Sequence, residues 1–266
     1  MSIKGYWKGN YEVGIRRNTP AAAKMAEINV TGTRNVLEAM QELNIPRGVY
    51  TSSLAVYSDT HGRLVDESYR FEGKHLTVYD ETKWRAHYEV ALPMMQAGLP
   101  LIIVQPGVVY GINDHSSVRD ALIQYLQGQL PMTPQDTAFC WAHVEDVAHG
   151  HLLAMAQGKR GESYHICGEM MTFSGAIALA QELTGVPAPT MHPSPAIMRG
   201  MANMMGLLEP IFPLPTQYRY ESLRTIAGTT YIGTNEKARR ELGYTPRPLR
   251  EGLAEVLAHE QKLLQH

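Results

Sequence analysis

A tyrosine and a lysine four positions apart are the residues of this chain best suited to move a proton. Tyr79 and Lys83 stand in the sequence Tyr-Asp-Glu-Thr-Lys within a segment of helical pattern, so both side chains are expected on one helix face. An ammonium beside a phenol stabilises the phenolate and lowers a pKa that is otherwise about 10. A tyrosine tuned in this way exchanges protons with a substrate hydroxyl.

A group of hydroxyl side chains ends a strand-like run upstream of this pair. The run Val49-Tyr50-Thr51-Ser52-Ser53 places three hydroxyls where a parallel strand meets its following loop. Ser53 is the candidate for the site. Thr51 and Ser52 are neighbouring alternatives, and a serine at a strand end also serves to satisfy a backbone group.

Two helices and two strands must position these groups. Thr19 as N-cap and Pro20 at the first helical position predict a helix over 20–43, which Asn44 and Pro46 end. Strands are predicted over 47–53, as a buried strand, and over 100–107, with a second helix over 79–98 between them. Strand, helix and strand in this order predict a right-handed parallel crossover. The apolar face of the first helix is expected to comprise Met25, Ile28, Val36, Met40 and Leu43.

The alternation continues downstream and then changes. Helices are predicted over 116–128 and 144–158, and a strand over 163–168 extends the same sheet. From Thr172 the pattern is mostly helical, with a last helix from Pro248. The fold class is therefore α/β: an incomplete Rossmann-like parallel sheet with helices over residues 1–168, and a smaller, mostly helical substrate lobe with the C-terminal helix over 169–266. Residues 1–18 read as an irregular arm.

The composition is that of a globular protein. The 266 residues are 44% hydrophobic and 19% charged, which excludes disordered and fibrous classes. A net charge of -2 without a Lys/Arg run makes nucleic acid an unexpected partner. Cys140 and Cys167 lack metal spacing and are expected in the core of a protein in a reducing cytosol. No apolar run reaches signal-peptide or membrane-spanning length, so a cytoplasmic location is expected and a membrane is not an expected partner.

Six separated blocks together resemble the extended short-chain dehydrogenase/reductase family, also called the NAD-dependent epimerase/dehydratase family. Within it, the chain looks most like the dihydroflavonol-reductase-like and sugar-epimerase-like branches. One Tyr-x-x-x-Lys alone is weak evidence, whereas six blocks in family order are specific. The blocks are Asn29-Val30-Thr31-Gly32-Thr33, Tyr50-Thr51-Ser52-Ser53, Tyr79 with Lys83, Pro106-Gly107-Val108-Val109-Tyr110-Gly111, His143-Val144-Glu145-Asp146-Val147 and Glu241-Leu242-Gly243-Tyr244-Thr245-Pro246.

The resemblance implies an oxidoreductase or epimerase acting at a hydroxyl or carbonyl carbon, such as a reductase, a dehydrogenase or a sugar epimerase. Tyr79 would be the acid/base, Ser53 would orient the substrate oxygen, and Lys83 would lower the pKa of Tyr79 and bind the nicotinamide ribose. The implied cofactor is NAD or NADP, contacted by Tyr79 and Lys83 and by the segment that follows the second strand, at Pro106, Val108 and Val109. The substrate is expected to be a small hydroxyl or carbonyl compound or a sugar derivative.

Supporting and structural roles are expected for other residues. By the resemblance, Asn29 ties the first helix to the site through backbone hydrogen bonds. Arg16 and Arg17 read as a solvated charge pair. Three histidines lack a metal-ligand pattern and read as structural: His143, His149 and His151.

The chain departs from the family in one respect. Relatives begin with a strand, a glycine turn and a helix that bind the dinucleotide pyrophosphate, and no such turn occurs in this sequence. The simplest hypothesis is that the chain corresponds to the C-terminal part of a longer enzyme. The alternative function is a catalytically inactive fragment or dimerising module, since in relatives the helices corresponding to 20–43 and 79–98 form a homodimer contact.

A methionine-rich segment offers three interpretations. Residues at helical spacing between 195 and 208 form one apolar face that serves as core, as a lid over an apolar substrate, or as a membrane-surface helix. Core is the preferred interpretation. The face comprises Ile197, Met201, Met204, Met205 and Leu208.

Overall fold

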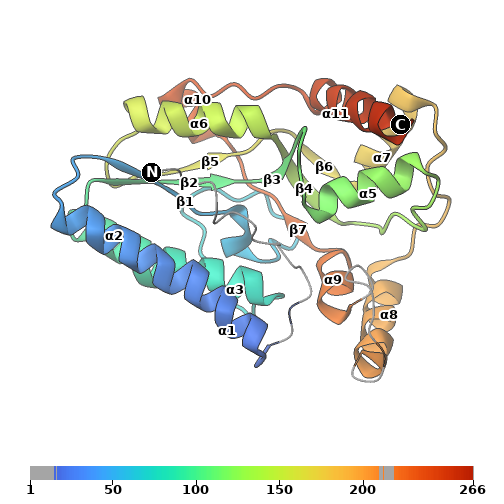
Figure 1. The fold of residues 1–266 in the computed structure, drawn as a ribbon, viewed down its shortest axis with the longest axis horizontal. Helices are drawn as coiled ribbons and strands as arrows, with labels where there is room; N and C mark the ends of the chain where they lie inside the picture. Colours follow the sequence, from blue (N-terminus) through green and yellow to red (C-terminus); the bar gives the residue numbers. More distant parts are fainter. Residues whose placement is uncertain (1–14, 16, 210–211, 213–218, 266) are drawn as a thin grey trace.

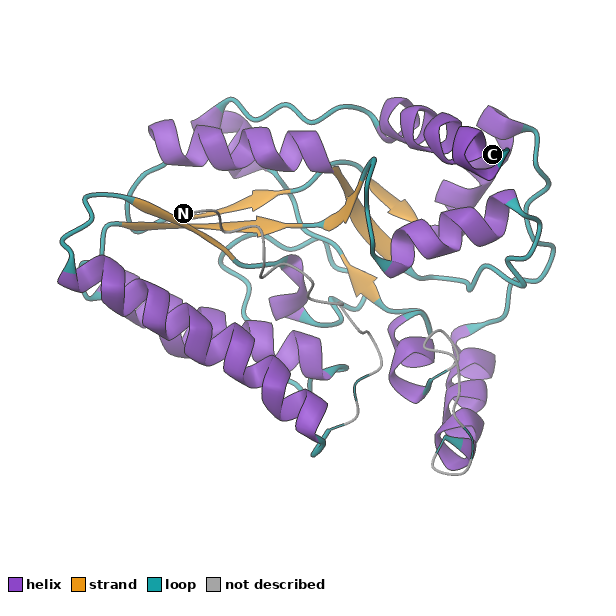
Figure 2. Cartoon of the chain, in the orientation of Figure 1, coloured by secondary structure: helices purple, strands orange, loops and turns teal. Residues whose placement is uncertain are grey.

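The computed structural model describes residues 15, 17–209, 212 and 219–265, so the predicted arm over 1–18 lies mostly outside the described residues. Helices lie on both sides of a parallel sheet, which confirms the α/β class (Figures 1 and 2). The helices are α1 Pro20–Ala26, α2 Gly32–Glu42, α3 Val78–Arg85, α4 Leu92–Gln96, α5 Ser117–Leu126, α6 Val144–Gln157, α7 Phe173–Thr184, α8 Pro195–Leu208, α9 Tyr220–Thr225, α10 Glu236–Leu242 and α11 Leu249–Leu264. The strands are β1 Gly48–Thr51, β2 Leu101–Pro106, β3 Val108–Tyr110, β4 Ala138–His143, β5 Ser163–Ile166, β6 Met170–Thr172 and β7 Thr230–Tyr231.

The first sheet has the order β1-β2-β5 and is parallel throughout, which confirms the predicted crossover. Every residue of β2 is buried. Leu101 and Ile103 pack against the α1–α4 side, while Ile102 and Val104 pack against α6 and α10 on the other face. Because successive strand side chains point to opposite faces, this continuous apolar run fills two cores.

A second sheet is built around β4. It pairs with β3 in parallel, with β6 antiparallel and with β7 in parallel. The strand predicted over 163–168 therefore extends the first sheet as β5, whereas β4 belongs to the second sheet. Both β6 and β7 come from beyond residue 168, and the proposed boundary between two domains stays a prediction.

The first long helix begins as predicted, since the Thr19 side chain accepts a hydrogen bond from the Ala22 N–H. A π-helical turn, Glu27–Thr31, joins α1 to α2, and a second one, Ala86–Ala91, joins α3 to α4. The predicted apolar face is wrong at three of its positions, since Ile28, Val36 and Leu43 are exposed. Met40 is buried as predicted, and the other buried residues are Val30 and Leu37, which lie outside the predicted face. A π turn contains an extra residue, which rotates the following side chains away from the phase of a regular helix.

Strand β1 is half-buried rather than buried as predicted, and Thr51 at its end is exposed. Among the described residues β1 pairs only with β2, so its other edge carries no strand. An apolar depression of about 330 Å³ lies on this side, between α2 and β1, and includes Val36, Leu43 and Tyr50. The uncovered edge explains why the strand is only partly shielded.

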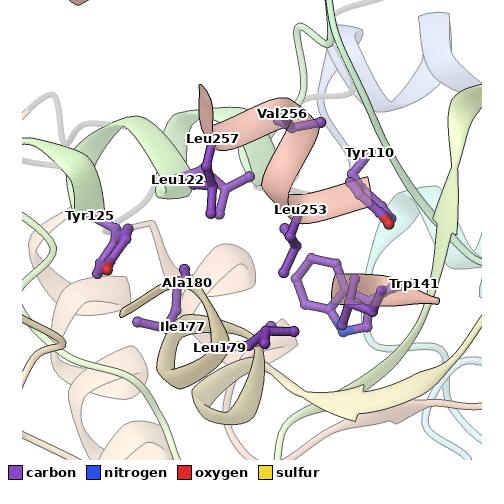
Figure 3. Packing of buried hydrophobic residues seen from close by; sticks show 12 residues of the cluster. Tyr110, Leu122, Tyr125, Trp141, Ile177, Leu179, Ala180, Leu253, Val256 and Leu257 are labelled. Carbon is purple, nitrogen blue, oxygen red and sulfur yellow. The ribbon is translucent and has the colours of Figure 1, made fainter. Parts of the chain in front are cut away.

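The ends of β3 and β4 are held by the largest apolar cluster, in which α5, α7 and α11 meet (Figure 3). Tyr110 and Trp141 are 2% and 3% exposed and belong to this core. The Trp141 indole N–H donates to the Met171 carbonyl at 3.1 Å. This cluster fixes the position of β3, and with it the segment that follows Pro106.

The methionine-rich segment forms α8, which packs beside α9 (Figure 1). Its fully buried residues are Met198 and Ala202, with Met201 and Met205 partly buried. The core interpretation is wrong for three residues of this face, which are exposed: Ile197, Met204 and Leu208. Among the described residues, no helix combines the length and apolarity required to cross a membrane.

Candidate active site

The helix that carries the tyrosine and the lysine begins at a fixed residue. The Thr77 hydroxyl caps α3 by accepting from the Asp80 N–H at 3.0 Å, and Asp80 is the third residue of the helix, as in a capping box. Tyr79 is therefore the second residue of α3, and its side chain is half-buried. Lys83 follows one turn later on the same face.

The lysine reaches the end of β1. The Lys83 Nζ donates to the Thr51 carbonyl at 3.2 Å and lies 5.8 Å from the centre of the Tyr50 ring. Burial lowers the pKa of Lys83 to about 8. The side chain thus remains mainly an ammonium at neutral pH, and it anchors α3 to the strand that precedes the serines.

The three hydroxyls after β1 have different partners. The Thr51 Oγ1 lies 2.8 Å from the His151 Nε2, and the buried Ser52 Oγ lies 2.8 Å from the His87 Nδ1. The half-buried Ser53 accepts from the Ala55 N–H at 3.1 Å, where a short 3₁₀ turn begins. Because the Ser53 Oγ accepts in this bond, its hydroxyl hydrogen can still be donated to another oxygen. The Ser53 hydroxyl thus keeps a donor available for a ligand.

The predicted cofactor segment lies at the same edge of the sheet. Thr51 ends β1 opposite Val104 in the parallel register, so Ser53 lies two residues beyond β1 and Pro106 two residues further along β2. Pro106 ends β2, and Val108 and Val109 begin β3 with partly buried side chains. Parallel strands place ligand sites at their carboxyl ends.

Two side chains join neighbouring segments to α3 in ways that differ from the predictions. Asn29 Nδ2 donates to the Thr82 Oγ1 at 2.9 Å, so this asparagine supports the site through its side chain rather than its backbone. Arg17 donates to the His75 carbonyl at 2.6 Å and pairs with Glu81 at 3.3 Å. Arg17 is thus bound to α3 and is not a solvated charge, while Arg16 lies outside the described residues.

The sequence did not indicate two buried carboxyl groups, one within α3 and one beside it. Asp80 is 2% exposed and accepts at 3.0 Å from both the Ser58 hydroxyl and the Tyr231 hydroxyl. Burial raises the pKa of Asp80 to about 6. The spacing Thr77-x-x-Asp80 was a signal for its capping position, but nothing in the sequence indicated its contact with β7.

Glu221 of α9 is the second of these carboxyl groups. It is 5% exposed, and its Oε2 has no hydrogen-bond partner among the described residues. Burial raises the pKa of Glu221 to about 7, although Arg17 and the Val78 N–H act in the opposite direction. Glu221 therefore places an acidic group of the C-terminal part beside the first residue of α3.

We expect Glu221→Gln to stabilise the protein at pH 8 by about 2 kcal/mol and to have little effect near pH 4.5. The folded-state pKa lies above the ordinary glutamate value, so stability falls as the pH rises from about 4.5 to about 7. A neutral glutamine avoids this loss. Thermal unfolding at both pH values measures the difference, with Glu38→Gln on the exposed face of α2 as control. Equal effects of the two variants on stability at pH 8 would contradict a raised pKa of Glu221 in the folded protein.

The three histidines occupy separate positions around α6. His143 is buried at its N-cap, His149 is exposed, and the His151 Nδ1 contacts the Val147 carbonyl at 2.7 Å. Within the part of the chain that the structure describes, no three His, Cys, Asp or Glu side chains gather as metal ligands. Cys140 and Cys167 are both buried free thiols.

The fold and these motifs agree with one family. The model of the NAD dependent epimerase/dehydratase family matches residues 10–167, and the chain belongs to this family. It is 30% identical over 242 residues to sterol demethylase protein B of Methylococcus capsulatus, covering 88% of this chain and 72% of that protein. It is 36% identical over 169 residues to a protein of Synechocystis named as a candidate dihydroflavonol 4-reductase, covering 60% of this chain and 49% of that protein.

A solved structure shows the same fold. UDP-glucose 4-epimerase of Thermotoga maritima, determined with UDP-glucose, has a TM-score of 0.68 at 20% identity, over 91% of this chain and 72% of that one. The expected membership of the NAD-dependent epimerase/dehydratase family is thus confirmed by the family model. The chain spans about half the length of the Synechocystis relative.

The residues fit one end of a nicotinamide dinucleotide. Lys83 donates one hydrogen bond among the described residues, to the Thr51 carbonyl. Because an ammonium has three donors, two remain for ribose hydroxyls. Pro106 and Val109 follow at the same sheet edge. The pyrophosphate end has no matching glycine turn in the sequence. The fit is therefore limited to the nicotinamide ribose.

Proposed function

We propose that this chain carries the proton-transfer site of an NAD(P)-dependent oxidoreductase or epimerase that acts at a hydroxyl or carbonyl carbon. The observation that carries the proposal is the hydrogen bond from the Lys83 Nζ to the Thr51 carbonyl. It anchors the helix of Tyr79 to the strand end from which Ser53 projects. Three groups that the family resemblance assigns to one site thus belong to two elements in direct contact.

Each residue has a role that follows from its chemistry. Ser53 donates a hydrogen bond to the substrate oxygen, and Tyr79 takes the hydroxyl proton in oxidation or returns it in reduction. The Lys83 ammonium favours the phenolate form of Tyr79. When bound, the cofactor supplies or accepts the hydride.

The substrate class that we favour is a hydroxylated apolar ring compound. Relatives named for sterols and for dihydroflavonols both point to such molecules. Exposed apolar side chains on α8, at Ile197 and Met204, are consistent with a lid over an apolar ligand. We also infer a cytoplasmic location from the composition and the two free cysteines.

We expect titration with NADH and NADPH to give saturable binding if the cofactor site is complete in the chain as it stands. Nicotinamide fluorescence and thermal stability are followed together, because a ligand that binds the folded state raises Tm. Lys83→Met is the matched variant, since it keeps the apolar stem and removes the donor. A folded chain without binding would contradict cofactor use by this chain alone.

A dimerising module is the second candidate function, favoured by the apolar surface of the first π-helical turn and of α2 up to its C-cap. Ile28, Val36 and Leu43 are 59%, 68% and 71% exposed. A homodimer through α1–α2 and α3–α4 would cover them. Light scattering measures the molecular mass of the chain and of its Val36→Lys variant, and a dimer through this surface should be lost in the variant. A dimerising module would dimerise equally well after Tyr79→Phe.

A further inference from the structure

The two cysteines of the chain, Cys140 and Cys167, meet at one backbone carbonyl. The Cys140 Sγ donates to the Gly233 carbonyl at 3.2 Å, and the Cys167 Sγ donates to the same oxygen at 3.4 Å. The Gly233 N–H in turn donates to the Cys140 Sγ at 3.3 Å. Two sulfur atoms that share one acceptor are neighbours, although they are far apart in the sequence.

The fold brings the two cysteines together from different strands. Cys140 lies in β4, Cys167 directly follows β5, and both side chains belong to one apolar cluster. Gly107 lies between their backbones, since a Cβ at this glycine would be 2.2 Å from the Cys140 carbonyl oxygen and 3.1 Å from the Cys167 Cβ. The missing side chain therefore allows β4 and the end of β5 to approach the same point of the chain.

The surroundings make one of the two thiols the better nucleophile. The hydrogen bond from the Cys167 thiol lowers the pKa of Cys140, and the Gly233 N–H acts in the same direction, while burial opposes both. The same bond between the thiols, together with burial, raises the pKa of Cys167. Cys140 is therefore the thiol that ionises first, and Cys167 is the thiol next to it.

We propose that Cys140 and Cys167 are an oxidation site at which a peroxide converts the two thiols into an intramolecular disulfide. The Cys140 thiolate attacks one oxygen of hydrogen peroxide, the O–O bond breaks, and the products are a sulfenic acid and hydroxide, which takes up the Cys140 proton. The Cys167 thiolate then attacks the sulfenic sulfur, which forms the S–S bond and releases the second hydroxide, which takes up the Cys167 proton.

The two thiols thus lose two electrons and two protons, and one molecule of hydrogen peroxide becomes two molecules of water. The proposal does not depend on the proposed function, because it requires neither cofactor nor substrate. Both sulfur atoms are buried, so the oxidant reaches them when the structure opens locally. The reaction is therefore expected to take minutes to hours.

The test is treatment of the folded full chain with about 1 mM hydrogen peroxide at pH 7.5, followed by alkylation of the remaining thiols in guanidinium. Thiols are counted instead of the intact mass, because the 14 methionines also take up oxygen. Lys159 and Arg160 lie between the two cysteines, so trypsin releases them in different peptides. We expect both thiols to be lost at the same rate, with the two peptides joined until dithiothreitol separates them.

Single variants test the order of the two steps. Cys140→Ala and Cys167→Ala each leave one thiol and a small buried side chain in place of the other. The remaining Cys167 should react with peroxide about tenfold more slowly than the remaining Cys140. Neither variant should give joined peptides within one chain.

The result on the unaltered chain decides the proposal even if a variant does not fold. Two thiols that are still alkylated after a day of treatment would overturn it. Separate oxidation of each thiol to a sulfinic acid, which dithiothreitol does not reverse, would also overturn it. A disulfide between two chains, seen as a dimer on a non-reducing gel, would overturn the intramolecular bond.

Discussion

Replacing Tyr79 by phenylalanine is expected to lower kcat by about 10³-fold for any alcohol or ketone that the unaltered chain turns over. The change removes one hydroxyl and keeps the ring, so the second residue of α3 keeps its packing. Lys83 would then have no phenolate to stabilise. Nicotinamide absorbance, with hydroxysteroids and dihydroflavonols as the first substrates tried, measures the loss.

The Kd for the cofactor separates a chemical effect from a structural one. Losing one hydroxyl contact is expected to change this Kd by less than about tenfold, so the loss should fall on kcat. Tyr244→Phe is the matched control, because the Tyr244 hydroxyl is buried without a hydrogen-bond partner among the described residues. Turnover that survives Tyr79→Phe would refute the proton-transfer role.

Local patterns predicted the elements well where they carry their own boundary signals. Thr19 with Pro20 correctly predicted the start of the first long helix, and Ser116 caps α5 through its side chain. The continuous apolar run at 101–104 correctly predicted a parallel strand, and the structure buries all of it. In each case the stabilising contact lies within a few residues or on both faces of one strand, so the sequence itself contains the information.

Contacts between residues far apart in the sequence could not be predicted as well. The two π turns changed the phase of the long helices, and no residue pattern signals such a turn, so Ile28 and Val36 were placed wrongly. Glu221 lies far from α3 in sequence and meets it only through the fold. The roles of Ser53, Tyr79 and Lys83 come from the family resemblance, and their geometry supports those roles without testing them.

Replacing Gly107 by alanine is expected to lower the free energy of unfolding by about 3 kcal/mol, or Tm by roughly 8 °C. An added Cβ would lie 2.2 Å from the Cys140 carbonyl oxygen and 3.1 Å from the Cys167 Cβ. The first of these is a backbone atom of β4, which cannot rotate away. Either β4 or the Pro106–Val108 segment must therefore move.

Which of the two segments moves decides whether the loss of stability also affects the candidate cofactor site. If the segment after Pro106 moves, cofactor binding should weaken together with Tm, which calorimetry and NADH fluorescence measure on the same sample. Gly200→Ala in α8 is the control, because no atom lies within 4 Å of its added Cβ and alanine favours a helix by about 1 kcal/mol. An unchanged Tm in Gly107→Ala would mean that β3 and β4 are packed more loosely than the structure indicates, and that the position of Val108 is not fixed by this contact.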